Sequence, residues 1–222
     1  MDFQYFCSQH REPLAEASVV AEEMTSDYFK LTSRHWLAAR YDISTLADLR
    51  EGEISPHALA LVAKYDGCPA GRVLRSSSFD FYRVCLQDHN ILKALAARED
   101  LKLFPFLCYI LTHELVHIVR FSRFEARFDT SAEEKHQEEA RVHQLTWKIL
   151  APLNNSLDLG PVIEYHQQHW QGGCENAHLR VSMRGLRESD GSLAEVFRGT
   201  PDRLSGLRRP HGETHQQLRL SS

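Results

Sequence analysis

The chain has 222 residues, of which 42% are hydrophobic, and its formal net charge is −4. This composition is typical of a globular protein with one good-sized core, and the mild acidic balance gives no reason to expect binding to nucleic acid. The five cysteines are scattered and form no C-x-x-C pair. That pattern favours reduced thiols in the cytoplasm over a disulfide framework.

The first ten residues are of mixed polarity and lack the apolar run of a secretory signal. The longest apolar stretch, residues 101–119, is interrupted by Lys102, Pro105 and several polar side chains. We expect it to be too polar to cross a bilayer. The sequence therefore predicts a cytoplasmic protein that does not enter a membrane.

Three segments in the first ninety residues show a regular pattern. Residues 12–40 carry apolar side chains at roughly helical spacing, which predicts a helical region. Residues 55–65 are predicted to form a shorter helix, because Pro56 would occupy its first position. Residues 79–87 alternate between two faces, which predicts a strand.

The most informative feature of the chain is an H-E-x-x-H motif formed by His113, Glu114 and His117. Two histidines four residues apart lie on one face of a helix, so both imidazoles can reach one metal ion. Glu114 is then placed to act as general base on a metal-activated water. The flanking residues are almost all apolar, which predicts a buried helix. The alternative is a core helix with two hydrogen-bonded histidines and one carboxylate partner.

Residues 110–119 resemble the active-site helix of the zincin metallopeptidases. The resemblance implies that His113 and His117 are zinc ligands and that Glu114 is the catalytic carboxylate. It also implies that the strand over residues 79–87 forms a sheet edge along which an extended substrate binds by strand addition. An ordinary half-buried strand is the alternative.

A catalytic zinc takes three protein ligands, so one more ligand is needed. The metzincin continuation does not supply it, because Arg120 and Arg123 stand where its glycine and third histidine would be. Residues 131–150 predict a second helix with apolar side chains at helical spacing. Ser131 and Glu134 suit a capping box at its start.

This second helix resembles the glutamate helix of the gluzincins. That resemblance implies Glu139 as the third ligand, with Val142 at the apolar +3 position and His143 at +4. Glu138 is the rival, although Arg141 would then stand at +3. His143 departs from the family pattern, in which Asp or Asn is commoner. It either orients a ligand imidazole or binds the metal itself.

Residues 162–170 predict a further helix, followed by a segment without apolar periodicity. Zincins commonly use a Tyr or His outside the metal motif to stabilise the oxyanion. Three residues of this helix are candidates for that role: Tyr165, His166 and His169.

Together these features predict an α+β fold, a mainly helical zincin-like domain with a small β-sheet. We expect residues 1–70 to form a helical region that packs on or covers the catalytic domain, residues 71–172 to form that domain, and residues 173–222 to be a weakly ordered basic tail. The predicted function is hydrolysis of peptide or protein substrates by a zinc metallopeptidase that holds one Zn²⁺ per chain. The alternatives are a non-peptide amide hydrolase and a regulatory or protein-binding module with a structural or vestigial zinc.

Overall fold

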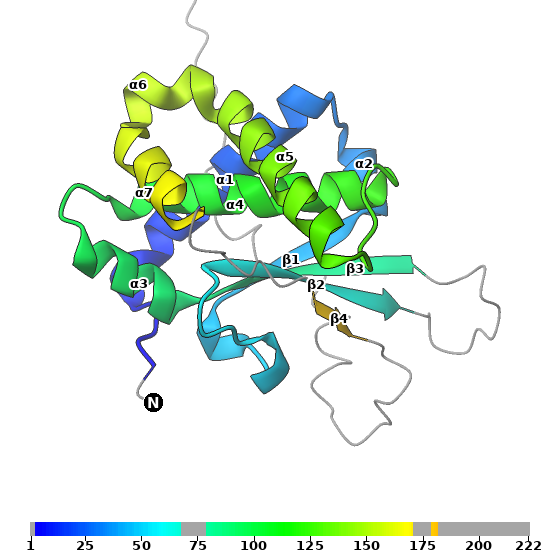
Figure 1. The fold of residues 1–222 in the computed structure, drawn as a ribbon, viewed down its shortest axis with the longest axis horizontal. Helices are drawn as coiled ribbons and strands as arrows, with labels where there is room; N and C mark the ends of the chain where they lie inside the picture. Colours follow the sequence, from blue (N-terminus) through cyan, green and yellow to red (C-terminus); the bar gives the residue numbers. More distant parts are fainter. Residues whose placement is uncertain (1–2, 68–78, 171–178, 182–222) are drawn as a thin grey trace, which may run out of the picture. The chain divides into compact units, whose positions relative to one another are not determined.

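The computed structural model describes residues 3–67, 79–170 and 179–181. All of them belong to one of the two units into which the chain divides, Met1–Met183, and the second unit, Arg184–Ser222, lies outside the described residues. The first unit is mixed α and β, mostly helical with a small sheet, which confirms the predicted fold class at this coarser level. Figure 1 shows α1, α4 and α5 gathered on one side of the strands.

The helices and strands follow one another along the chain as α1 (Ser8–Phe29), α2 (Ser33–Ala38), β1 (Arg40–Ser44), β2 (Ala60–Gly67), β3 (Phe79–Leu86), α3 (Asp88–Ala97), α4 (Leu103–Ser122), α5 (Ala132–Leu150), α6 (Asn154–Leu157), α7 (Gly160–Trp170) and β4 (Leu179–Val181). The predicted helical region over residues 12–40 is divided between α1 and α2. Lys30 ends α1 in the left-handed conformation, with φ 54°, and its amide donates to the carbonyl of Ser26.

The predicted helix over residues 55–65 is wrong, because most of this segment belongs to β2. Leu61, Ala63 and Tyr65 point to one face of the sheet, whereas Ala60 and Val62 join the core on the other face. A short apolar run of this kind fits a buried strand as well as a helix. Pairing with β3 along the whole of β2 satisfies its backbone and decides between the two.

The sheet has the strand order β1-β3-β2-β4. β3 is parallel to β1 and antiparallel to β2, and β2 is parallel to the short β4. β3 therefore lies inside the sheet with a neighbour on each side. The expectation that it forms an edge for strand addition by a substrate is wrong, because its backbone groups are already paired.

α4 is the central helix of the core. Every residue from Pro105 to Phe121 is buried, by α1, α5 and α7 and by strands β2 and β3. By length and composition α4 is the one helix among the described residues that could cross a membrane. However, 89% of its apolar 18-residue stretch is buried inside the protein. An apolar helix that is buried in this way is also typical of the core of a globular domain.

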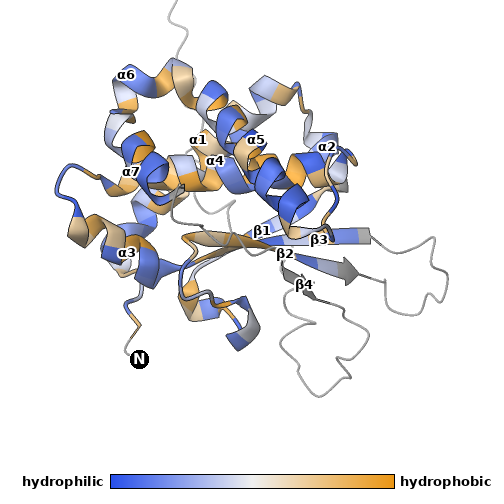
Figure 2. Ribbon diagram, in the orientation of Figure 1, coloured by the Kyte–Doolittle hydropathy of each residue, from blue (hydrophilic) through white to orange (hydrophobic). Residues whose placement is uncertain are grey.

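α5 is amphipathic and begins with the predicted capping box. The Ser131 hydroxyl accepts from the amide of Glu134 at 3.3 Å, and the Glu134 carboxylate accepts from the amide of Ser131 at 3.2 Å. Val142 and Ile149 pack against Val116 of α4. Figure 2 shows both hydrophilic and hydrophobic residues along α5, and its apolar residues Val142 and Ile149 are among those that pack on α4.

Residues 8–67 share their core with the later elements. α1 packs against α4, and β1 and β2 belong to the same sheet as β3. The predicted boundary at residue 70, between a region that packs on or covers the catalytic domain and that domain itself, stays a prediction. The predicted tail, residues 173–222, lies outside the described residues except for β4.

A buried carboxylate at the start of α3 joins two distant segments. Asp88, which is 1% exposed, accepts from the amide of Phe6 at 2.9 Å and from the amide of Leu46 at 3.1 Å. Asp88→Ala should lower the free energy of unfolding by about 3 kcal/mol, because both donors lose a charged acceptor. Urea unfolding measures this, with Asp27→Ala on the exposed surface of α1 as the control. A loss equal to that of the control would contradict the expected role of Asp88.

Candidate metal centre

The middle of α4 carries the two histidines of the motif. His113 is 4% exposed and His117 is fully buried. Their Nε2 atoms are 3.2 Å apart, because a four-residue spacing places both imidazoles on one face of the helix about one turn apart. The geometry thus brings two imidazole nitrogens to one point, as expected from the sequence.

Glu139 reaches the same point from α5. Its Oε2 atom lies 3.2 Å from His113 Nε2, and its Oε1 atom lies 3.2 Å from His117 Nε2. Glu139 is 4% exposed. Two helices that are apart in sequence therefore place a carboxylate across from both imidazoles, inside the core.

The spacing of these three groups fits a zinc ion. Zn–N and Zn–O bonds of about 2.0–2.1 Å in a tetrahedral site place neighbouring ligand atoms about 3.3 Å apart. The two Nε2 atoms are 3.2 Å apart and each is 3.2 Å from a different oxygen of Glu139, so these separations are close to that value. Two imidazoles and one carboxylate suit zinc and would also accept manganese, iron or cobalt. Three such ligands would leave the fourth position of a tetrahedral zinc site for water or substrate.

The electrostatics of His113 reflect the same neighbours. Burial alone lowers its pKa, but the hydrogen bond to Glu139 and the negative charges of Glu139 and Glu114 outweigh burial and raise the pKa above its ordinary value. A cation at this point is therefore favoured by its surroundings, whether it is a proton or a metal ion.

Glu138, the rival for the third ligand, is occupied elsewhere. Its Oε1 and Oε2 atoms accept from Nε and Nη2 of Arg120 at 2.5 and 2.9 Å. Adjacent residues of a helix differ by about 100° in direction, so Glu138 and Glu139 contact different parts of α4. The structure brings Glu139 rather than Glu138 to the histidines.

His143, one turn after Glu139, lies beside His113. Their ring centroids are 4.4 Å apart, and the hydroxyl of Tyr109 is 3.0 Å from His143 Nδ1. Burial, followed by the neighbouring His113 and His166, lowers the pKa of His143 to about 2, so the ring is neutral. A ligand atom of His143 lies within 4.8 Å of those of His113 and Glu139. Both roles expected for it, orienting His113 or binding metal, are therefore compatible with its place.

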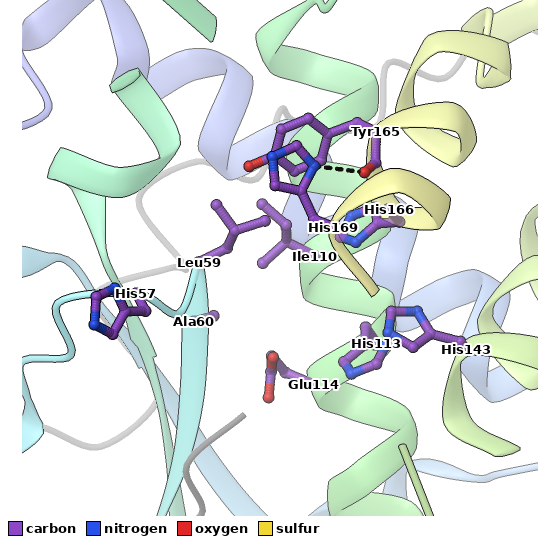
Figure 3. A pocket seen from close by; sticks show the side chains of 10 residues that line it. All are labelled: His57, Leu59, Ala60, Ile110, His113, Glu114, His143, Tyr165, His166 and His169. Atoms are coloured by element: carbon purple, nitrogen blue, oxygen red, sulfur yellow. Dashed lines mark hydrogen bonds between the residues drawn. The ribbon is translucent and has the colours of Figure 1, made fainter. Parts of the chain in front are cut away.

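A pocket opens beside this cluster. Glu114 and His113 contribute to its wall from α4, as does His143 from α5. The remaining lining residues come from the loop before β2, from the first residue of β2, and from α4 and α7: His57, Leu59, Ala60, Ile110, Tyr165, His166 and His169. Figure 3 shows Glu114 with its carboxylate in this space, next to His113. Glu114 is 5% exposed, so it contacts the pocket from a largely buried position.

All three candidates for stabilising an oxyanion line this pocket. Tyr165, His166 and His169 come from α7, and His169 Nδ1 donates to the carbonyl of Tyr165 at 2.8 Å. Burial, then His113 and His169, lowers the pKa of His166 to about 3. His166 is therefore neutral. The geometry alone does not favour one of the three residues as the oxyanion stabiliser.

Two contributors to the site were missed in the sequence. His57 lines the pocket from the loop before β2, a segment that was predicted to be helical. Tyr109 holds His143 from the preceding turn of α4. The four-residue step from Tyr109 to His113 is a helical signal that could have indicated the place of Tyr109 beside the site.

A scan against models of protein families, a search of curated proteins and a search of solved structures each found no match for this chain.

Proposed function

We propose that this protein is a zinc-dependent metallopeptidase of the gluzincin type. One observation carries the proposal: His113, His117 and Glu139 converge at separations of 3.2 Å within the core. A buried carboxylate and two imidazoles would be expensive to retain at one point without a cation between them. The zincin-like identity of the fold rests on this cluster and on the resemblance of the two helices that carry it.

The place of Glu114 favours an enzyme over a structural zinc site. A structural zinc is closed by four protein ligands, whereas a catalytic zinc keeps one open position. Glu114 lines the pocket together with the ligand His113. A carboxylate beside an open metal position is what a hydrolytic mechanism needs, and a purely structural site has no use for it.

The proposed chemistry assigns distinct roles to these residues. When bound, zinc supplies Lewis acidity, which polarises a carbonyl group and lowers the pKa of a water molecule. Glu114 accepts a proton from the attacking water and then donates it to the nitrogen of the leaving amine. A hydrogen bond from Tyr165, His166 or His169 stabilises the negative charge that develops on the carbonyl oxygen. Glu139 and the two histidines hold the ion.

The proposal is tested by metal content and hydrolysis together. We expect about one zinc per chain by mass spectrometry of the purified protein, and cleavage of a mixed peptide library that stops on addition of a chelator and returns with zinc. Absence of bound zinc after zinc has been supplied would overturn the proposal. Stoichiometric zinc without cleavage of peptides or of other amides would favour the regulatory module instead.

A further inference from the structure

Arg120 is a buried cation next to the candidate metal centre, and none of the proposed chemistry uses it. Its side chain is 6% exposed and lies three residues after His117 on α4. Its guanidinium donates to both oxygens of Glu138 and, through Nη1, to Glu125 at 2.9 Å. A buried arginine with two carboxylate partners is strongly held in place.

The main chain of Arg120 is fixed as well. Its carbonyl accepts from the amides of Glu125 and Ala126 at 2.9 and 3.3 Å. These bonds close the turn after α4, in which Phe124 has φ 57°. Arg120 is therefore anchored at both its backbone and its side chain, which makes it a rigid point of attachment for a neighbouring helix.

The carboxylate that Arg120 holds belongs to the residue just before Glu139. Two parallel hydrogen bonds between a guanidinium and a carboxylate fix direction as well as distance, because both groups are planar. Since adjacent helical residues differ by about 100°, holding Glu138 on one side of α5 directs Glu139 to another. That other direction is the one in which Glu139 meets His113 and His117.

We propose that Arg120 and Glu138 are positioning residues for the metal centre: their paired hydrogen bonds fix the rotation of α5 about its axis, so that Glu139 faces the two histidines. This inference rests on the proposed function, because it concerns the same metal ion. It distinguishes the two adjacent glutamates by role, with one holding the helix and the other available to the metal.

The test replaces both members of the pair, because removing one alone would leave a buried charge without its partner. Arg120→Met/Glu138→Leu exchanges the pair for apolar side chains, a change that is often neutral for folding. Zn²⁺ affinity is measured on the full chain by competition with a chromophoric chelator. The absorption spectrum of bound Co²⁺ reports the geometry of the ligands independently of activity. Glu125→Gln is the control, since it alters the more exposed partner of the same arginine.

We expect the double variant to bind Zn²⁺ about 10- to 100-fold more weakly, the range found when partners that orient metal ligands are lost, and to show an altered Co²⁺ spectrum. The control should stay within about twofold of the wild type. Wild-type affinity and spectrum in a folded double variant would overturn the inference. If the double variant does not fold, Arg120→Lys decides, because it keeps the charge without the paired bonds: weaker binding supports the inference, and unchanged binding overturns it. Failure of the wild type to bind zinc would instead refute the proposed function, and this inference with it.

Discussion

Glu114→Gln is expected to abolish hydrolysis almost completely while leaving zinc bound. The amide has nearly the shape of the carboxylate but cannot accept a proton from water, so general-base catalysis is lost. Such catalysis contributes about 10²- to 10⁴-fold, and we expect kcat to fall by about 10³-fold. Because Glu114 lies outside the cluster of His113, His117 and Glu139, zinc content should remain at the wild-type level.

The measurement compares peptide cleavage and zinc content in the same preparations. Glu133→Gln is the matched control, because it makes the same chemical change on an exposed part of α5; its activity should equal that of the wild type. Loss of zinc together with activity would show that Glu114 maintains the site instead of reacting. Unchanged activity with zinc bound would remove Glu114 from the mechanism.

The elements that carry the cluster were predictable because their signals are local. The bounds of α5 follow from a capping box and a helical apolar pattern, both contained within about twenty residues. The spacing of His113 and His117 fixes their relative position as soon as α4 is helical. The choice between Glu138 and Glu139 depended on helix phase, and the structure directs Glu139 to the histidines. Its role as a metal ligand stays a prediction.

The sheet could not be predicted in the same way, because pairing between distant segments decides it. Ser55 precedes a proline and looks like the start of a helix. In the structure its amide donates to Gln87, 32 residues later, and its carbonyl accepts from Asn90. These contacts hold the loop before β2, and β2 itself pairs with β3. His57 reaches the pocket only because of this arrangement, so periodicity could not reveal it.

The position of β3 within the sheet has the same origin. The alternation of side chains between two faces over residues 79–87 predicts a strand. The structure confirms it as β3, Phe79–Leu86. Whether a strand is central or at an edge depends on what pairs with it, and here β1 joins β3 in parallel after more than thirty intervening residues. Such a parallel pair needs a long connection and carries no turn signature. The sequence of β3 alone therefore does not distinguish the two positions.

Removal of the proposed third ligand is expected to have the largest effect on metal binding. Zinc binding in four-ligand structural sites amounts to about 10–16 kcal/mol, which is roughly 3 kcal/mol for each ligand. Glu139→Ala should therefore weaken zinc binding by at least about 100-fold. This exceeds the effect expected from disturbing the Arg120–Glu138 pair, because a ligand itself is lost.

Chelator competition on Glu139→Ala, with Glu133→Ala as the control on the same helix, measures this directly. The control should bind zinc as the wild type does, since Glu133 is exposed at the first turn of α5. Wild-type affinity in Glu139→Ala would contradict the assignment and leave His143 as the nearest replacement, because one of its ligand atoms lies within 4.8 Å of those of His113 and Glu139. His143→Ala would then have to lose zinc. If instead Glu139→Ala loses zinc and His143→Ala retains it, His143 acts by orienting His113, and two imidazoles and one carboxylate are the complete protein contribution to the metal site.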